Sequence, residues 1–368
     1  MMKDVVRRVG QRFMIGFEGL VASEDARALI RQLGVGHVIL FARNVVGPEQ
    51  VAELIRELQS AAREGGHERP LFVTVDQEGG RVARLKEPWT LWPPLRAVGR
   101  SGSEELARRM GAALAAELTA CGFGGDLAPV VDVDTNPANP VIGDRSLGDD
   151  PDLVGRLGAA MIRGLQEGGV AACAKHFPGH GDTELDSHLE LPIVEQPRSR
   201  LEDVELRPFR KAIEAGVAMI MTAHVLVREL DDSVPATLSP RVVGALLRKE
   251  LGYSGVVVAD DLEMKAIAKG GGPKRASVMA AKASCDVIGV GKNHDAQVEA
   301  IEALIRAAES GEVSFAEMEA ADGRVRRLKE TFLADYRDPD PRRARMAAGA
   351  AEHRAVAEEI AARSGIPA

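Results

Sequence analysis

The stretch VAACAKHFPGHGDTELDSH, residues 170–188, joins a short apolar run to a polar loop, and the chain repeats this arrangement. The run VAACA (170–174) has seven counterparts, at 12–17, 37–41, 71–75, 127–133, 217–222, 255–259 and 285–290. Continuous apolar runs of this length are typical of strands buried on both faces of a parallel sheet. Longer stretches of helical period separate them, at 48–64, 104–121, 151–168, 200–215, 239–250 and 295–310. Eight such runs predict the α/β class and a single (β/α)8 barrel of TIM type.

The chain contains no linker that would divide this barrel. No Gly/Ser-rich or Pro-rich segment interrupts the sequence, so we expect one barrel domain over residues 1–335. Residues 336–368 are expected to form a charged hinge and a C-terminal helical tail. A doubly wound open sheet is the alternative fold, but it needs a phosphate-binding glycine turn after the first strand. The segment GFEGL (16–20) does not have that pattern.

The composition restricts the kinds of partner that the chain can bind. Forty-seven Lys and Arg against 55 Asp and Glu give a formal charge of −8, so a nucleic-acid partner is not expected. Nine Phe, two Tyr and two Trp are few for 368 residues, which argues against base-stacking platforms and long aromatic polysaccharide grooves. We therefore expect a small ligand that is held mostly by hydrogen bonds.

Cysteine usage and hydropathy indicate the compartment. Cys121, Cys173 and Cys285 are an odd number without CxxC spacing, and we expect buried free thiols in a reducing environment. The N-terminal stretch MMKDVVRRVGQRFMIGF lacks the cleavage site of a secretory signal. No window reaches the roughly 18 apolar residues of a membrane-spanning helix. The sequence thus predicts a soluble, cytoplasmic monomer without a membrane partner.

Polar residues follow several of the predicted strands at the point where each strand ends. They are Arg43, Asn44, Asp76, Gln77, Glu78, Arg81, Asp132, Asp134, Lys175, His176, His224, Asp260 and Asp261. A single carboxylate after a strand is often only the N-cap of the next helix. In a barrel, however, the C-terminal ends of the strands converge on the one face that houses catalysis. The sequence therefore predicts an active site at this face.

Three of the eight histidines, His176, His180 and His188, fall within the opening stretch and suggest a metal site. A helical His pair would need an unbroken helix, which Pro178, Gly179 and Gly181 prevent. We therefore expect no metal and no cofactor. A metal site built on the loop and a purely structural glycine-rich turn remain alternatives.

The pair Asp186 and His188 has the pattern of a tuned proton carrier. A carboxylate beside an imidazole can accept its N–H, fix its tautomer and raise its basicity. The sequence has no Gly-x-Ser-x-Gly elbow and no cysteine in a reactive setting. Carboxylates are the remaining nucleophiles, and Asp260, at the end of the run GVVVA, is the best placed. An aspartate nucleophile with a proton donor is the layout of a retaining glycosidase.

Several long motifs resemble those of glycoside hydrolase family 3, and in particular the NagZ-type β-N-acetylglucosaminidases (β-hexosaminidases) of bacterial cell-wall recycling. They are DQEGGRVARL (76–85), VVDVDTNPANPVIGDRSLG (130–148), KHFPGHGDTELDSHLELP (175–192), MTAHV (221–225) and VVVADDLEMKAI (256–267). The similarity extends from about residue 10 to 335 in the expected order.

This resemblance implies roles for individual residues. Asp260 would be the nucleophile, and His188, oriented by Asp186, the proton donor and later the base. The sugar-binding residues would be Asp76, Arg84, Arg145, Lys175 and His176. The resemblance also implies a closed, one-sugar pocket. Its substrate would be a small oligosaccharide or muropeptide, GlcNAc β-linked to 1,6-anhydro-N-acetylmuramic acid with or without peptide.

Some positions depart from the family pattern or have a structural alternative. Leu147 replaces an aromatic residue usual in the family, and Gly291-Lys292-Asn293 matches no family pattern, which leaves the leaving-group side open. We expect His180 to brace its loop, Asp261 to cap a helix beginning at Leu262, and Glu78 to be a buried partner of Arg81. His224 could be a pocket wall or a core histidine. Trp89 and Trp92 are expected to pack their loop, with a stacking surface for a second sugar as the alternative.

Three other functions are compatible with the sequence. A family 3 enzyme could use phosphate in place of water as the acceptor, or act on other β-GlcNAc or β-glucosides. A metal-dependent barrel hydrolase would use His176, His180 or His188 with Asp260. A barrel that binds sugar without catalysis would not need Asp186, His188 and Asp260 together.

Overall fold

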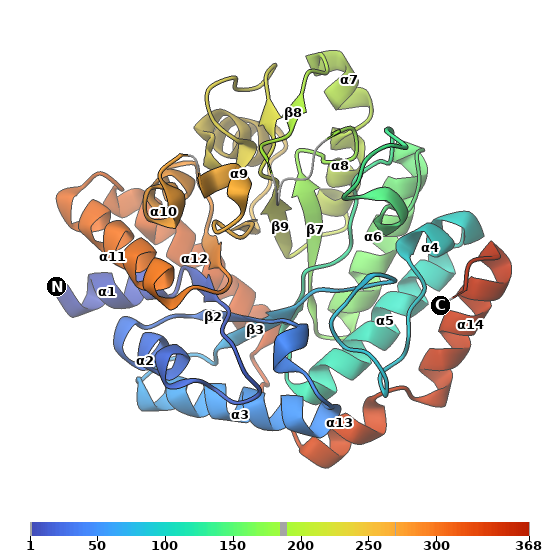
Figure 1. Cartoon of the computed structure of the whole chain (residues 1–368), viewed down its shortest axis with the longest axis horizontal. Helices are drawn as coiled ribbons and strands as arrows, with labels where there is room; N and C mark the ends of the chain where they lie inside the picture. Colours follow the sequence, from blue (N-terminus) through green and yellow to red (C-terminus); the bar gives the residue numbers. More distant parts are fainter. Residues whose placement is uncertain (1, 185–189, 269, 368) are drawn as a thin grey trace.

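The computed structural model describes residues 2–184, 190–268 and 270–367, and at its centre eight parallel strands form a closed barrel (Figure 1). The strands are β1 (Phe13–Ile15), β2 (His37–Leu40), β3 (Phe72–Val75), β6 (Gly125–Asp126), β7 (Ala171–Phe177), β9 (Met219–Thr222), β11 (Val256–Ala259) and β12 (Val287–Val290). Neighbouring strands follow the order β1, β12, β11, β9, β7, β6, β3, β2. Phe13 pairs with Ile288 where β1 meets β12 and the barrel closes. The predicted (β/α)8 barrel is confirmed.

The fourth barrel strand is shorter than the sequence predicts. A strand is expected over 127–133, whereas β6 covers only Gly125–Asp126, and beyond it Val130 forms a single bridge with Lys175. Pro129 interrupts the ladder because a proline has no N–H to donate. The run 127–133 is apolar because the segment that follows β6 is buried, although this segment is not part of the strand.

Helices connect the strands and flank the barrel (Figure 1). They are α1 (Met2–Gly10), α2 (Glu24–Leu33), α3 (Pro48–Glu64), α4 (Leu95–Ser101), α5 (Glu104–Cys121), α6 (Pro151–Glu167), α8 (Leu206–Glu214), α10 (Gly272–Lys282), α11 (His294–Ser310) and α12 (Phe315–Phe332). The helix predicted over 200–215 is two helices, α7 (Arg198–Asp203) and α8, because Val204 leaves the helical backbone region. The segment predicted as a helix over 239–250 forms a π-helix over Pro240–Glu250.

Side-chain caps fix the starts of several helices. Ser103 accepts a hydrogen bond from the Leu106 amide at the start of α5, and Asn293 caps α11 in the same way. At α12, Ser314 and Glu317 form a reciprocal capping box. Caps of this kind satisfy amides that have no partner inside the helix, and each contributes about 1 kcal/mol.

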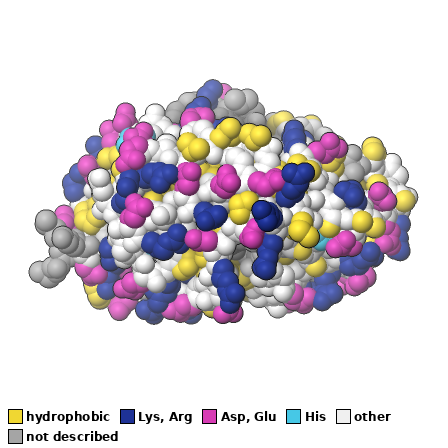
Figure 2. All heavy atoms as spheres, turned by 90° about the horizontal axis from the view of Figure 1, so that it is seen from below, with side chains coloured by type: hydrophobic (Ala, Val, Ile, Leu, Met, Phe, Trp, Pro, Cys, Tyr) yellow, Lys and Arg dark blue, Asp and Glu magenta, His cyan; other side chains and the backbone are white. Residues whose placement is uncertain are grey.

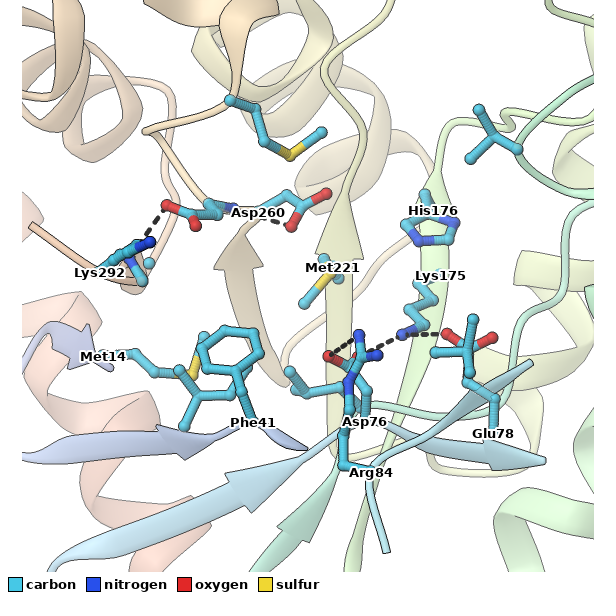
Figure 3. A pocket seen from close by; sticks show the side chains of 18 of the residues that line it. Met14, Phe41, Asp76, Glu78, Arg84, Lys175, His176, Met221, Asp260 and Lys292 are labelled. Carbon is cyan, nitrogen blue, oxygen red and sulfur yellow. Dashed lines mark hydrogen bonds and ion pairs between the residues drawn. The ribbon is translucent and has the colours of Figure 1, made fainter. Parts of the chain in front are cut away.

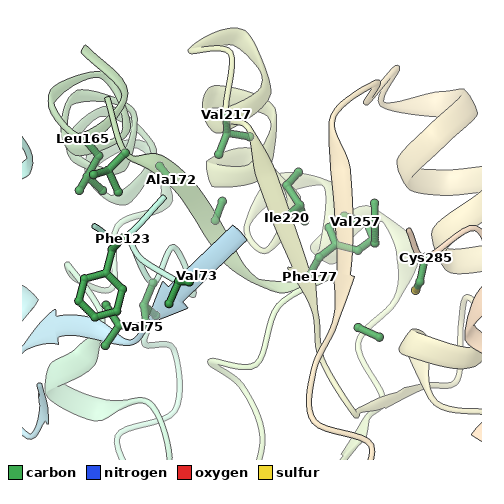
Figure 4. Packing of buried hydrophobic residues seen from close by; sticks show 14 of the residues in the cluster. Val73, Val75, Phe123, Leu165, Ala172, Phe177, Val217, Ile220, Val257 and Cys285 are labelled. Atoms are coloured by element: carbon green, nitrogen blue, oxygen red, sulfur yellow. The ribbon is translucent and has the colours of Figure 1, made fainter. Parts of the chain in front are cut away.

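Alternation along the strands divides the core into two layers. In β7, Ala171 and Cys173 belong to the cluster that fills the barrel, whereas Ala172 belongs to the layer between strands and helices. Figure 4 shows part of this outer layer, which includes Leu165 of α6 and Ile220 of β9. Inside the barrel, side chains such as Phe72, Met219 and Val258 fill the interior, so the barrel is a packed core and not a pore.

The C-terminal segment packs against the barrel helices. Its helices are α13 (Pro341–Ala347), beside α3, and α14 (Ala351–Ser364), beside α4 and α5 (Figure 1). Buried Glu117 of α5 accepts a hydrogen bond from the Gly349 amide at 2.9 Å and contacts His353 Nδ1 at 3.1 Å. Before α13, Asp338 forms two 3.0 Å hydrogen bonds with Arg63 of α3. The segment expected to be a charged hinge is thus held to the barrel by ion pairs.

The surface carries both signs of charge. On the face that Figure 2 shows, basic and acidic side chains are interspersed, and neither sign forms a continuous field there. In the part of the chain that the structure describes, no helix combines the length and the apolar character needed to span a bilayer.

A buried ionic cluster holds the N-terminal side of the barrel together. Asp286, which precedes β12, is fully buried and accepts hydrogen bonds from Arg248, from Arg324 of α12 at 2.8 Å, and from the Val257 amide at 2.8 Å. Two arginines and one amide of three different segments therefore converge on one carboxylate. Removing one partner of such a group leaves buried charges uncompensated.

We expect Asp286→Ala to lower the free energy of unfolding by about 3 kcal/mol, because Arg248 and Arg324 lose their shared anion. Urea unfolding followed by circular dichroism measures this change. The matched control is Glu302→Ala, which removes an exposed ion pair with Arg306 and should change stability by less than about 0.5 kcal/mol. Equal effects of the two substitutions would contradict the structural importance of the cluster.

Candidate active site

A cavity of about 350 Å³ opens at the C-terminal ends of the barrel strands (Figure 3). Six of the eight predicted catalytic and sugar-binding residues line it: Asp76, Arg84, Arg145, Lys175, His176 and Asp260. They come from segments up to 184 residues apart, from Asp76 to Asp260, and the closed barrel brings them together. The two other predicted catalytic residues, Asp186 and His188, lie outside the described residues.

Lys175 is the centre of a charge cluster on one wall of the cavity. It belongs to β7 and is 2% exposed, and its Nζ lies 2.7 Å from Asp76 Oδ1 and 2.6 Å from Glu78 Oε1. Burial disfavours the ammonium ion, but Asp76 and Glu78 outweigh this effect and raise the pKa of Lys175 above its ordinary value. Lys175 is therefore a fixed cation with carboxylates on two sides.

Glu78 also binds Arg145. The carboxylate accepts two hydrogen bonds of 2.8 Å from Nε and Nη2 of the guanidinium, and Glu78 is 1% exposed. Burial opposes the charge of Glu78, but Lys175 and Arg145 together hold the pKa of the carboxyl well below its usual range. The expected pairing of Glu78 with Arg81 is wrong, because Arg81 reaches Asp144 at 3.1 Å instead. Two cations thus neutralise one buried anion and fix the wall of the cavity.

His176 is oriented by a second carboxylate. Its Nδ1 lies 2.7 Å from Asp132 Oδ2. Asp132 also accepts hydrogen bonds from the backbone amide of His176 at 3.2 Å and from that of His180 at 2.7 Å. An Nδ1–H that donates to Asp132 leaves Nε2 as the ring atom available to a ligand. His180 Nδ1 contacts Thr183 Oγ1 at 2.8 Å, as expected of a histidine that braces its loop.

Asp260 lies across the cavity from this cluster, directly after β11 (Figure 3). One of its oxygens accepts the Asp261 amide at 2.8 Å. Burial opposes ionisation, but His224, His176, this amide and Lys175 hold the pKa of Asp260 below its ordinary value. At neutral pH, Asp260 is therefore an ionised carboxylate at the wall of a cavity, as a nucleophile requires.

Asp261 joins two barrel loops, a role that differs from the expected cap. Its side chain accepts hydrogen bonds from the backbone amides of Glu263 at 3.0 Å and of Gly291 at 3.1 Å. No helix begins at Leu262, since α9 covers Lys265–Ala268. Burial raises the pKa of Asp261 to about 6. The carboxyl group thus ties the end of β11 to the segment after β12.

His224 and the two tryptophans are parts of the core. His224 is 1% exposed, with Nδ1 at 2.9 Å from Thr237 Oγ1 and Nε2 at 3.0 Å from the Asp261 carbonyl, which supports the core-histidine interpretation. Trp89 and Trp92 are each 2% exposed and pack in the hydrophobic core. They do not offer the stacking surface that was the alternative.

The remaining wall of the cavity was not predicted from the sequence. Met14, Ile39, Phe41, Leu127 and Met221 supply an apolar part of the lining. These residues belong to apolar runs or their edges, where a pocket residue cannot be told from a core residue. Lys292, in the stretch that matches no family pattern, lines the cavity on the side of β12.

Metal ligation is the alternative chemistry that the histidines suggest. Within residues 2–184, 190–268 and 270–367, no group of three or more His, Cys, Asp or Glu side chains is placed to hold a metal ion. His188, which that alternative could use, lies outside these ranges. The described residues instead surround the cavity with paired charges.

Comparison with known proteins places the chain in a family. The model of the glycosyl hydrolase family 3 N-terminal domain matches residues 5–328. A β-hexosaminidase of Alkalilimnicola ehrlichii is 41% identical over 281 residues, which cover 75% of this chain and 79% of that protein. β-Hexosaminidase A of Pseudoalteromonas piscicida is 38% identical over 311 residues, 76% of this chain. The chain spans about half of that longer relative, 52% of its length.

Solved structures give the same result. A family 3 β-N-acetylglucosaminidase from Paenibacillus sp. is 44% identical with a TM-score of 0.91, over 98% of this chain and 68% of that one. NagZ from Neisseria gonorrhoeae, in complex with N-trifluoroacetyl-D-glucosamine, is 30% identical with a TM-score of 0.79, over 96% and 98% of the two chains. The chain belongs to glycosyl hydrolase family 3, and it is a glycoside hydrolase related to the β-hexosaminidases of that family.

Proposed function

We propose that this protein is a retaining, exo-acting β-N-acetylglucosaminidase that removes terminal non-reducing GlcNAc from small peptidoglycan fragments. The substrate is GlcNAc-1,6-anhydro-N-acetylmuramic acid with or without its peptide. One observation carries the proposal: an ionised carboxylate, Asp260, lies across a small cavity from a fixed cluster of polar groups around Lys175. Relatives named β-hexosaminidase and β-N-acetylglucosaminidase support the same activity.

The cluster around Lys175 supports binding of one sugar residue. Asp76 is a carboxylate that can accept sugar hydroxyls, and Lys175, Arg84 and Arg145 can donate to hydroxyl and acetamido oxygens. His176 can form a further hydrogen bond to the sugar through Nε2, since its Nδ1 is bonded to Asp132. A volume of about 350 Å³ is at the low end of the usual range for ligand sites. A pocket of this size favours a single terminal sugar over an internal segment of a polymer.

The proposed reaction has two displacements at the anomeric carbon. Asp260 attacks this carbon and forms a covalent glycosyl ester while the bond to the leaving oxygen breaks, and His188 donates the proton that this oxygen needs. In the second step His188 takes a proton from water, which attacks the same carbon and releases Asp260. Asp186 is proposed to orient His188. Fixed charges around Asp260 keep the nucleophile ionised before the substrate arrives.

The substrate class and the compartment have separate support. The preference for peptidoglycan fragments is based on the sequence motifs shared with enzymes of cell-wall recycling. Cys121, Cys173 and Cys285 are buried free thiols, which supports a reducing compartment such as the cytoplasm. The proposal includes a monomer that acts alone on its small substrate.

Substitution of the proposed nucleophile should abolish activity. We expect Asp260→Ala to reduce p-nitrophenol release from the β-GlcNAc glycoside by at least about a thousandfold, because no covalent ester can form. The control is Asp232→Ala, an exposed aspartate that lies outside the five motifs and does not line the cavity. Melting temperatures of both variants show whether they are folded. Full activity of a folded Asp260→Ala variant would rule out this nucleophile.

Substitution of the proposed proton donor should have an effect that depends on the leaving group. Nitrophenolate leaves with little help from an acid, whereas a sugar alkoxide needs protonation. We therefore expect His188→Ala to lower kcat/KM by about tenfold for the nitrophenyl glycoside and by about 10³-fold for a GlcNAc disaccharide. Equal losses on the two substrates would show that His188 is not the acid.

The products identify the substrate and the acceptor. We expect the protein to release free GlcNAc from GlcNAc-1,6-anhydro-N-acetylmuramic acid with a higher kcat/KM than from chitobiose, measured by chromatography with mass detection. Proton NMR early in the reaction should show β-GlcNAc as the first product, since two displacements retain the configuration at the anomeric carbon. A product of GlcNAc 1-phosphate in phosphate buffer would show a phosphorylase instead. Initial release of α-GlcNAc would contradict the covalent intermediate.

A further inference from the structure

A second cavity lies on the N-terminal side of the barrel, away from the candidate active site. It measures about 300 Å³ and is lined by residues of α1, of the segment before β3 and of α12. The parallel strands begin on this side and end at the candidate active site, so the two cavities lie at opposite ends of the barrel. The proposed reaction uses none of the residues that line this second cavity.

The most deeply buried group of this cavity is a lysine without a carboxylate partner. Lys329 of α12 is 2% exposed, and its Nζ donates to Gln11 Oε1 and to the Gly36 carbonyl, each at 2.9 Å. Both acceptors are neutral, and among the described residues no Asp or Glu forms an ion pair with Lys329. A buried ammonium ion normally has a compensating anion, because desolvation of its charge is costly. The charged form of Lys329 loses its hydration on burial, and no carboxylate among the described residues compensates for this loss.

Further basic side chains line the cavity beside this lysine. Arg69, at the edge of the cavity, repels the charge on Lys329, and it is itself paired at the surface with Glu330 at 2.7 Å and Glu68 at 3.5 Å. His67 and Arg7 complete the same wall. The Arg7 guanidinium donates to the Gly65 carbonyl at 2.8 Å, so its position is set by the backbone. Both ring nitrogens of His67 are engaged, Nε2 with the Ile30 carbonyl and Nδ1 with the Gln11 amide, so His67 shapes the wall and does not donate to a ligand. Lysine and arginine side chains bind oxyanions through charge-assisted hydrogen bonds.

Three of the four acidic residues that line the cavity lie at its exposed rim. Asp4, Glu68 and Glu319 are exposed, and Asp322 is partly buried beside Arg8. Exposed carboxylates interact weakly with a buried cation, since water screens them. The bottom of the cavity therefore holds one basic group, Lys329, whereas the opening carries charges of both signs, including that of Arg326.

We propose that this cavity is a binding site for a small oxyanion, namely phosphate or the phosphate group of a small metabolite, with Lys329 as its buried anchor and Arg69 as its second cation. The anion would receive hydrogen bonds from Lys329 and Arg69 and would relieve the repulsion between them. The site is independent of the glycosidase reaction. Its occupancy would stabilise the folded protein by mass action.

Binding should be coupled to protonation. Burial, with a smaller contribution from Arg69, lowers the pKa of Lys329 to about 7. The pKa of His67 is also lowered by burial, and the fully buried His37 lies behind the site. An anion beside Lys329 favours its charged form, so at pH 7.5 binding should take up a proton from the buffer. A variant without the lysine, Lys329→Met, shows whether Lys329 is the group that takes up this proton.

The test uses the full chain and inorganic phosphate as the probe, with acetate as the carboxylate counterpart. Isothermal titration at pH 7.5, in two buffers of different ionisation enthalpy and at constant ionic strength, gives the affinity and the proton uptake. We expect Lys329→Met and Arg69→Gln to weaken phosphate binding by about tenfold or more. Proton uptake should be lost in Lys329→Met. If acetate binds as tightly as phosphate, the assignment to phosphate is wrong.

Two control variants distinguish binding in this cavity from binding elsewhere on the protein. Lys282→Met removes an exposed lysine that pairs with Glu312, and it should leave phosphate affinity unchanged. Arg84→Gln removes a cation from the candidate active site, and it should also leave that affinity unchanged. Arg69 is one-third exposed and its substitution carries little risk of unfolding, which keeps the test valid if Lys329→Met is unstable. Equal phosphate affinity in the parent protein and in Arg69→Gln, or no saturable binding by the parent protein, would overturn the proposal.

Discussion

The pairing of β1 with β12 is the constraint on which the rest of the structure depends. Phe13 and Ile288 are far apart in the chain, yet their strands lie side by side and close the sheet into a barrel. A closed parallel barrel leaves no strand edge unpaired, and it directs the C-terminal ends of all strands to one face. In this closed ring β3 and β11 lie on opposite sides, so Asp76, after β3, and Asp260, after β11, line one cavity.

Within that cavity, charge compensation determines which groups are ionised. Glu78 is buried between Lys175 and Arg145, and Lys175 between Asp76 and Glu78, so each charge has a partner of opposite sign. Such a network costs desolvation and contributes little net stability, but it holds polar groups in fixed positions. The preorganisation is of the kind that transition-state stabilisation requires. The proposed binding of a sugar by hydrogen bonds rather than by stacking fits a chain with few aromatic residues.

The two ends of the barrel differ in how their buried charges are balanced. At the C-terminal end, the buried cations Lys175 and Arg145 are paired with carboxylates. At the N-terminal end, Asp286 pairs with two arginines, whereas the acceptors of Lys329 among the described residues are neutral. Residues at the N-terminal end of such barrels usually serve stability. An uncompensated lysine beside a cavity does not fit that role, and an exchangeable anion would account for it.

The sequence by itself determined the fold class, because eight apolar runs separated by helical periods are a local signal that needs no tertiary information. It also identified Asp76, Lys175, His176 and Asp260 as polar residues that follow predicted strands, whereas Arg84 and Arg145 were predicted only from the resemblance of their motifs to the family. The partners of these residues could not be predicted. Glu78 was expected to pair with nearby Arg81, but Arg145, distant in sequence, binds it. Long-range pairing of charges depends on how the strands are placed around the barrel, and the chain order does not contain that placement. The same holds for the apolar wall around Phe41 and for buried Lys329, whose environments exist only after the barrel has closed and α12 has packed beneath it.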